Sequence, residues 1–297
     1  MLAAIPFPDI PHEIVIPLPW GSGLPLRFYA LAYLIGLVGG WAIIGALMRR
    51  PRLWPGDRAP MTPKMVEDLL TATILGVILG GRLGYVLFYD LGHFLENPAD
   101  IVKVWEGGMS FHGGFLGVVV AGIWFCRRHS IPPLQLGDAL ALVAPLGLFL
   151  GRIANFINAE LWGRPTDLPW GVIFPGEAAQ TCAGVIPGEC ARHPSQLYEA
   201  GLEGLLLGLV LYILFRLGAL KRPGTLMGVF LVGYGLARMF VELFRQADQQ
   251  FISADDPAGN VLSLGDFGLH MGQLLSLPMV IVGLWFLIRA RRRPATA

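Results

Sequence analysis

Charged residues are scarce in this chain. Only 14% of its 297 residues are Asp, Glu, Lys or Arg, whereas soluble domains carry about 25%. Hydrophobic residues make up 54% of the sequence, and the mean hydropathy is +0.59. The net charge of +1 at pH 7 excludes a general polyanion binder, so no nucleic-acid partner is expected. The composition therefore predicts a protein of the membrane bilayer.

Cysteine is equally rare. The three cysteines, Cys126, Cys182 and Cys190, show no CxxC or Cys/His spacing of the kind that binds zinc, so neither a metal site nor a cofactor is expected. No secretory signal peptide is expected either, because residues 1–26 have neither a basic start nor a continuous apolar core. The sequence also lacks the internal repeat that marks the two-halves architecture of many transporters.

Long apolar runs are what the sequence does contain. A helix needs about 20 such residues to cross a bilayer. Seven runs approach or exceed this length, at 27–48, 68–89, 112–126, 136–158, 197–216, 224–244 and 269–289. The third run is short and must begin near Phe111 or include its glycines. The sequence therefore predicts an all-α integral membrane protein with seven transmembrane helices.

Basic residues mark one side of the predicted membrane. Lys and Arg collect after the first, third, fifth and seventh runs, whereas the alternate loops are acidic. Loops rich in Lys and Arg stay in the cytoplasm. The pattern therefore predicts an N-terminus outside the cell membrane and a cytoplasmic C-terminus.

The chain divides into four predicted parts. Residues 1–26 form an outer arm, 27–159 the first four helices, 160–192 a small outer head domain, and 193–297 the last three helices with a basic cytoplasmic tail. The head is expected to fold because Pro and Gly punctuate a segment that also holds Trp162 and Trp170. Cys182 and Cys190 lie there on the oxidising side, either as a short disulfide or as two free thiols.

Polar residues interrupt the apolar runs, and an ionisable group at membrane depth is costly unless it has a partner. The segment GRIANFINAELWGR, residues 151–164, ends the fourth run. If the helix continues through it, Arg152, Asn155 and Gly163 lie on one face, with Glu160 at its margin. The alternative is an arginine that reaches for the interface beside a helix cap.

A second polar face lies in the sixth run. Tyr234, Arg238, Glu242 and Arg245 follow one another at helical spacing, so Glu242 can pair with both arginines. These residues form either part of a site or an ion-pair stripe that joins helices.

His112 stands between glycines in GGMSFHGG, where backbone and ligand can come close to it. It is either a functional group or a structural histidine. Arg82, Tyr85 and Tyr89 form a further polar face in the second run, which either lines the same cavity or joins helices through hydrogen bonds.

Two more features lie near these groups. Tyr29 is near the outer end of the first run, as an interface anchor or as a catalytic group. HPSQLYE, residues 193–199, brings Gln196, Tyr198 and Glu199 to the start of the fifth run. Glycines at four-residue spacing, Gly76, Gly80 and Gly84 and again Gly204 and Gly208, predict close helix packing.

The polar groups share the outer half of the predicted membrane. Arginine grips phosphate through two parallel hydrogen bonds and does not lose its proton. The residues themselves therefore predict an intramembrane site for a phosphate-bearing lipid on the outer side. They do not identify the reaction.

GRIANFINAELWGR resembles the signature of the bacterial prolipoprotein diacylglyceryl transferase family, approximately G-R-x-G/A-N-F-x-N-x-E-x-x-G. The resemblance extends through GGRLGYVLFY, GGMSFHGG, RHPSQLYE, YGLARMFVELFRQAD and MGQLLSLPM, and so covers nearly the whole chain. It implies an enzyme of the bacterial inner membrane with its active site toward the periplasm. Such an enzyme moves the diacylglyceryl group of phosphatidylglycerol to the lipobox cysteine of a prolipoprotein signal peptide, leaving a thioether and glycerol phosphate.

The resemblance also implies roles for single residues. Arg152 and Arg238 would hold the lipid phosphate, while Asn155, Glu160 and Gly163 would shape the site. His112, Tyr29 and Tyr234 would be the other essential side chains. Glu242 and Arg245 share the face of Arg238 and are counted with the lipid-binding residues.

Several alternatives stay open at this point. A thiol with a pKa near 8.5 needs a base to become a nucleophile. His112 is the best candidate, but Tyr29 and Tyr234 are also plausible. An anionic-lipid transporter or flippase, which would want interrupted helices near the midplane, is the main alternative function. A seven-span receptor would need a cytoplasmic coupling surface, and none is evident.

Overall fold

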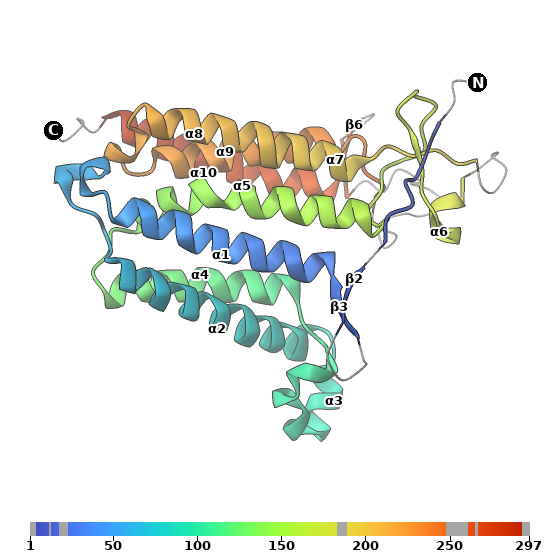
Figure 1. Ribbon diagram of the computed structural model, residues 1–297, viewed down its shortest axis with the longest axis horizontal. Coiled ribbons are helices and arrows are strands. Elements are labelled where there is room, and N and C mark those ends of the chain that lie inside the picture. Colours follow the sequence, from blue (N-terminus) through green and yellow to red (C-terminus); the bar gives the residue numbers. More distant parts are fainter. Residues whose placement is uncertain are drawn as a thin grey trace. The chain divides into compact units, whose positions relative to one another are not determined.

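The computed structural model describes residues 4–11, 13–17, 23–182, 189–247, 261–264 and 267–292, and it is mostly helical (Figure 1). The chain divides into two compact units. The first unit comprises Met1–Gly40 and Leu140–Pro294, and the second includes Trp41–Ala139. Residues 183–188 of the predicted head and the predicted tail from residue 293 lie outside the described residues.

The first unit holds most of the long helices. Its elements include the first part of α1 (Phe28–Met48), the last part of α5 (Pro133–Ile157), α6 (Glu177–Gln180), α7 (Ser195–Glu199), the π-helical segment η5 (Ala200–Leu206), α8 (Leu207–Arg216), η6 (Ala219–Lys221), α9 (Thr225–Val241) and α10 (Met271–Arg292). Helices α7, η5 and α8 are continuous, and α9 packs along α10 (Figure 1).

The second unit is built on a helix pair. Its elements are η1 (Pro51–Leu53), η2 (Pro55–Asp57), α2 (Pro63–Phe88), α3 (Leu91–Glu96), η3 (Pro98–Val102), η4 (Val104–Glu106) and α4 (Phe111–Arg128). Helices α2 and α4 pack with their backbones in contact. A Cβ added to Gly80 would lie only 2.4 Å from the carbonyl oxygen of Gly113, so glycine is needed there. The same holds for Gly117, whose Cβ would lie 1.9 Å from the carbonyl of Gly76. The predicted glycine packing is confirmed.

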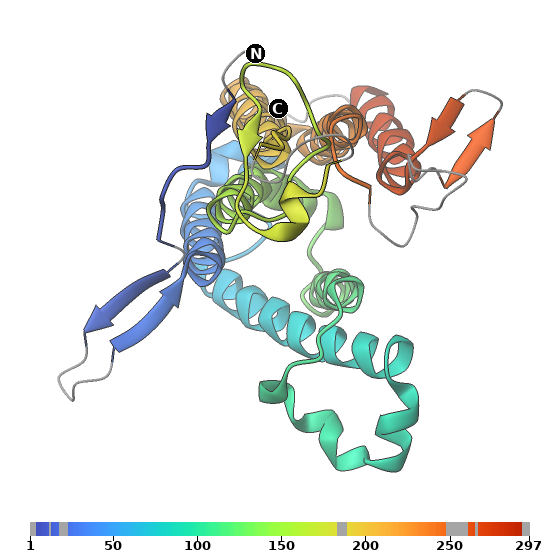
Figure 2. The ribbon, with the colours of Figure 1, turned by 90° about the vertical axis from the view of Figure 1, so that its right-hand side faces the viewer.

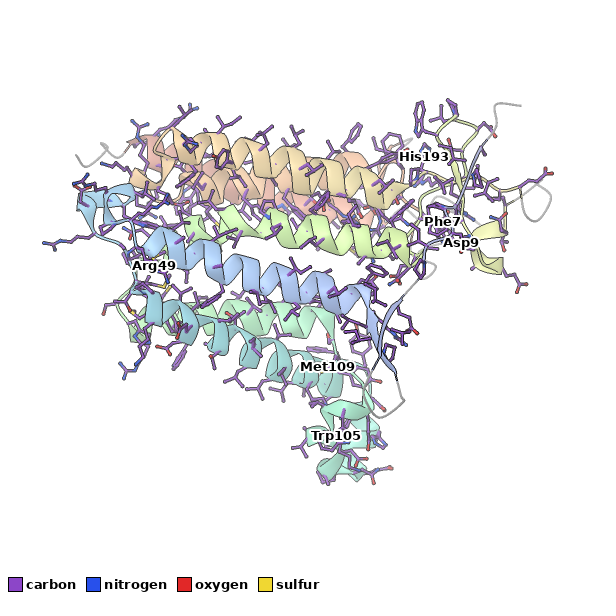
Figure 3. All side chains as sticks on the ribbon, in the orientation of Figure 1. Phe7, Asp9, Arg49, Trp105, Met109 and His193 are labelled. Carbon is purple, nitrogen blue, oxygen red and sulfur yellow. A yellow bond between two sulfur atoms is a disulfide. The ribbon has the colours of Figure 1, made fainter. Side chains whose placement is uncertain are left out.

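Arg82 serves the second unit rather than a lipid site. Its guanidinium donates to five carbonyl oxygens, those of Asp100, Ile101, Lys103, Gly107 and Gly108, at 2.5 to 3.3 Å. All five of its N–H donors thus hold the turn-rich segment that carries Trp105 and Met109 (Figure 3). Of the two alternatives, the structure favours a structural role for Arg82, although the bonds join a helix to a loop rather than two helices. Tyr85 and Tyr89 stack with ring centres 5.5 Å apart, and their alternatives stay open.

Five helices of the described residues are long and apolar enough to cross a membrane: Phe28–Met48, Pro63–Phe88, Pro133–Ile157, Ser195–Arg216 and Met271–Arg292. Helix α9 is a shorter apolar helix, and α4 carries Arg127 and Arg128 in its last turn. Helices thus form in all seven predicted runs. The count of seven crossings stays a prediction.

The chain is mostly helical, as expected, but short strands also occur among the described residues. Strand β1 (Ile5–Pro6) pairs in parallel with β4 (Val172–Ile173). Two antiparallel hairpins join β2 (Glu13–Pro17) to β3 (Gly23–Arg27) and β5 (Leu262–Leu264) to β6 (Phe267–Leu269) (Figure 2). Each is too short to show as alternation in the sequence.

The head has a small aromatic core. Phe174 is fully buried, and the rings of Phe7 and Phe156 lie 5.5 and 5.9 Å from it. Cys182 and Cys190 are joined by a disulfide, which decides between the two alternatives for this pair. The β1–β4 pairing fastens the N-terminal segment to this core (Phe7 in Figure 3).

Local capping explains where helices begin. Helix α2 starts at Pro63 rather than at residue 68, because the Thr62 hydroxyl accepts a hydrogen bond from the Met65 N–H at 3.3 Å and Pro63 occupies the first position. Helix α9 ends at Val241 rather than at residue 244. Beyond it the chain forms a bridge between Arg245 and Gly163, which requires extended backbone.

Candidate active site

The end of α5 brings Asn155 and Glu160 together by a turn. The N–H of Glu160 donates to the carbonyl of Asn155 at 3.1 Å, and that of Ala159 donates to Phe156 at 2.9 Å. With Ala159 in the left-handed region (φ 54°), these bonds form a Schellman motif. The helix therefore does not continue through residues 158–164, so the condition under which Gly163 would share a face with Arg152 is not met.

Four side chains gather at this helix end, and we call them the amide cluster: Tyr29, Asn155, Asn158 and Glu160. The amides of Asn155 and Asn158 donate to one carboxylate oxygen of Glu160 at 3.4 and 3.3 Å. The Tyr29 hydroxyl donates to the same oxygen and accepts from the Asn155 amide. Tyr29 is thus tied to the family-like motif rather than standing as an isolated interface anchor.

A second group, which we call the ion-pair cluster, is centred on Glu199. Its members are Arg152 of α5, Glu199 and Glu203 of the α7–η5 helix, Arg238 of α9, and Glu242 and Arg245 just beyond α9. Glu199 and Glu203 are fully buried. Buried charges of this kind need partners, because removing one member of a buried pair costs about 3–5 kcal/mol.

Three guanidinium groups converge on Glu199. Arg152 Nε lies 3.0 Å from one carboxylate oxygen, although its N–H is not aligned for a hydrogen bond. Arg238 and Arg245 both donate to the other oxygen, the latter at 3.1 Å. The arginines predicted to bind phosphate therefore already bind a carboxylate. The position of the Glu199 oxygens shows where these arginines can bind an anionic oxygen.

The predicted pairs within the sixth run are confirmed. Arg238 Nη2 lies 2.8 Å from Glu242 Oε2, and Arg245 Nε lies 4.0 Å from the same oxygen. Tyr234, one turn before Arg238, stacks on Phe230 with ring centres 5.9 Å apart. His112 is an exposed residue in the first turn of α4, within the second unit, and its predicted catalytic role stays a prediction.

Glu203 is the residue that sequence reasoning missed. It lies one turn after Glu199 in an otherwise apolar helix, and a carboxylate within such a run is itself a signal of function. The surrounding segment, Ala200–Leu206, is π-helical, and π segments inside helices are frequent at functional sites.

Two glycines allow the backbone to approach the ion-pair cluster. A Cβ on Gly163 would lie 2.4 Å from the carbonyl oxygen of Phe244, so only glycine fits where this strand-like segment pairs with Arg245. A Cβ on Gly272 of α10 would lie 2.4 Å from Glu242 Oε2. Gly163 shapes the site through the backbone of Arg245, and Gly272 through the side chain of Glu242.

The head adjoins the start of α7 through His193. Its Nδ1 lies 3.0 Å from the Tyr198 hydroxyl, and its ring packs edge-on against Phe244 (His193 in Figure 3). Burial lowers the pKa of His193 below its ordinary value. Arg192, also buried, lies over the Trp162 ring at 3.9 Å, and burial lowers the pKa of its guanidinium.

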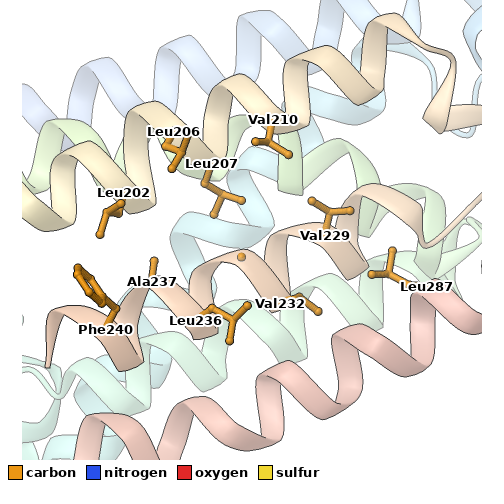
Figure 4. A pocket seen from close by; sticks show the side chains of 11 residues that line it. Leu202, Leu206, Leu207, Val210, Val229, Val232, Leu236, Ala237, Phe240 and Leu287 are labelled. Carbon is orange, nitrogen blue, oxygen red and sulfur yellow. The ribbon is translucent and has the colours of Figure 1, made fainter. Parts of the chain in front are cut away.

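An apolar groove runs along α8 and α9 (Figure 4). It has a volume of about 430 Å³ and is lined by Leu and Val side chains of η5, α8 and α9, with Leu287 of α10. Leu202 and Ala237 line it, and each directly precedes a member of the ion-pair cluster. Apolar walls beside a charged cluster suit a ligand with an anionic head and hydrocarbon tails.

These features define a multi-pass helical membrane protein with an arginine-rich anion site among its helices. The model of the family "prolipoprotein diacylglyceryl transferase" matches residues 17–289. The phosphatidylglycerol–prolipoprotein diacylglyceryl transferase of Ruegeria pomeroyi is 58% identical over 296 residues, covering 99% of this chain and 100% of that protein. That of Cereibacter sphaeroides ATCC 17025 is 60% identical, covering 98% of this chain and 99% of the relative. The chain belongs to the prolipoprotein diacylglyceryl transferase family.

Proposed function

We propose that this chain transfers the diacylglyceryl group of phosphatidylglycerol to the cysteine thiol of prolipoprotein signal peptides. The sulfur forms a bond to the terminal glyceryl carbon as that carbon's bond to the phosphate oxygen breaks. The thiol proton leaves, and glycerol phosphate is the second product. The site would face the periplasm of a bacterial inner membrane, with seven helices crossing from an outer N-terminus.

The convergence of Arg152, Arg238 and Arg245 on the oxygens of buried Glu199 carries this proposal. A phosphodiester presents oxygens of the same charge, and Arg is the side chain best suited to them. Because the arginines are held among buried groups, they can stabilise the charge that grows on the departing phosphate. The groove along α8 and α9 supports the lipid nature of the substrate.

The other candidate residues take roles around this centre. Glu160 and Asn155 hold the Tyr29 hydroxyl in place. His112 is the proposed acceptor of the thiol proton, and Tyr234 stands one turn from Arg238 on α9. A lipobox cysteine approaching from the outer side would meet the lipid at its glyceryl carbon.

The test is a transfer assay with purified protein, phosphatidylglycerol and a lipobox peptide. We expect a thioether-linked diacylglyceryl peptide and an equal amount of glycerol phosphate, both absent when the peptide cysteine is serine. Arg238→Ala should abolish both products. Arg216→Ala, whose guanidinium contacts Tyr212 at an exposed position, should retain them. Glycerol phosphate release without a cysteine peptide would overturn the proposal.

A further inference from the structure

Glu203 is a buried carboxyl group with unusually poor pairing. Its exposed fraction is 0%, and neither of its oxygens accepts a hydrogen bond within the part of the chain that the structure describes. Its closest ion-pair contact there is Arg152 Nη2, at 3.9 Å. A carboxylate in this position would be separated both from water and from donors.

The neighbouring carboxylates differ in this respect. Glu199 contacts three guanidinium groups, two of them through hydrogen bonds, and Glu242 Oε2 lies 2.8 Å from Arg238 Nη2, although that contact is not aligned for a hydrogen bond. Arg152 is closer to Glu199, by 3.0 against 3.9 Å. Arg152, the closest ion-pair partner of Glu203 among the described residues, is therefore already paired with Glu199.

Two physical effects act on Glu203 in the same direction. Burial disfavours the charged form of a carboxyl group, and so does a second carboxylate nearby on the same helix. Hydrogen bonds to the charged form and nearby cations oppose these effects, but no hydrogen bond reaches Glu203 from the described residues and Arg152 Nη2 is 3.9 Å away. We propose that Glu203 is a positioning residue that carries a proton, so that the ion-pair cluster holds one net positive charge.

The charge balance of the cluster indicates what this proton does in lipid binding. This step rests on the function proposed above. With all six groups ionised, three guanidinium groups and three carboxylates cancel. With Glu203 neutral, one positive charge remains, and it matches the single negative charge of a phosphodiester. The neutral Glu203 also leaves Arg152 able to turn from Glu199 to the phosphate without stranding a second buried carboxylate.

Charged and titratable groups face Glu203 from every packed element. Arg152 approaches from α5, Glu199 from α7, Arg238 and Tyr234 from α9, and Arg245 from the segment after α9. Ionisation of Glu203 would therefore cancel the net charge that these groups together present to a lipid. Anionic lipid should bind more weakly once the proton is lost.

Infrared spectroscopy of the purified protein tests the proton directly. At neutral pH we expect the carbonyl band of a protonated carboxylic acid, which Glu203→Gln should remove. Glu242→Gln is the matched control and should keep the band, because Glu242 is ion-paired. A wild-type protein without the band, or a band that persists in Glu203→Gln, would overturn the assignment. This readout does not depend on transfer activity, so it can fail or succeed independently of the proposed function.

Lipid binding tests the consequence. The Kd for phosphatidylglycerol in detergent micelles should rise by about tenfold between about pH 7 and about pH 9 in the wild type, as one unit charge is lost from a low-dielectric site. In Glu203→Gln the Kd should stay level over this range, and phosphatidylcholine should show no such dependence in either protein. An equal rise in Glu203→Gln would contradict the proposal.

Discussion

Arg152 joins the two clusters of the candidate site, because it lies one helical turn before Asn155. Its guanidinium reaches Glu199 through Nε and Glu203 through Nη2, at 3.0 and 3.9 Å. The planar, forked guanidinium of arginine can contact both carboxylates at once. A lysine ammonium is a single point charge and cannot contact both in this geometry.

Arg152→Lys should therefore lower kcat/KM for transfer by about a hundredfold, the effect typical of losing one preorganised donor. The measurement is thioether formation at several phosphatidylglycerol concentrations. Arg216→Lys, at an exposed position, serves as the control for a generic loss of guanidinium. Wild-type turnover in Arg152→Lys would show that charge alone suffices at this position.

Sequence reasoning at this scale found residues more readily than their partners. Arg238, Glu242 and Arg245 could be paired because helical spacing places them on one face. Glu199 was noticed without a role, since its arginines lie 39 and 46 residues away in the chain. The role of Arg82 depended on loop carbonyls whose positions no periodicity predicts.

At the scale of elements, glycine contacts set how close the helices and turns can lie. On α10, Gly272 leaves no room for a Cβ beside the Glu242 carboxylate. A methyl group there would push the flexible Glu242 side chain away from Arg238. The backbone need not move.

Gly272→Ala should thus lower transfer activity by about tenfold while the unfolding temperature stays near that of the parent, since alanine favours a helix over glycine. Gly122→Ala, where a Cβ meets no neighbouring atom, should leave activity unchanged. Activity and thermal unfolding measured together decide the matter. Equal losses of stability and activity would point to a packing defect instead.

Helix existence was predictable, and so were several helix ends: the runs 27–48, 136–158 and 197–216 end at or within one residue of the ends of α1, α5 and α8. Apolar runs predicted all seven helices, because length and hydropathy suffice for that. The turn that follows α5 was not predictable, because it depends on Ala159 in the left-handed region, where glycine is the usual residue. The π-helical turn likewise has no sequence pattern of its own.

For the whole molecule, the described residues form two units, and α1 and α5 pass from one to the other. Composition predicted the membrane class, because 14% charged residues cannot cover a soluble domain of this size. The β1–β4 pairing required the structure, because it joins segments far apart in the sequence, and the disulfide required it because the sequence left two alternatives open for Cys182 and Cys190.

Stability should depend on pH through His193. Burial lowers its pKa in the folded state, whereas the unfolded chain keeps the ordinary value of about 6.5. Below that value the unfolded chain binds more protons, so stability is lost as pH falls. The unfolding temperature in detergent should drop between about pH 7.5 and about pH 5, and less so in His193→Gln. Identical pH profiles would exclude His193 as the cause.

The pairing of β1 with β4 has a consequence for the outer surface of the head. The N–H groups of Ile5 and Phe7 point at β4 and donate to Gly171 and Ile173. The alternate positions, which face away, are Pro6 and Pro8, and proline has no N–H to offer. Between Ile5 and Pro8 this edge therefore offers no backbone N–H to another extended chain. This part of the edge is a poor template for an added strand.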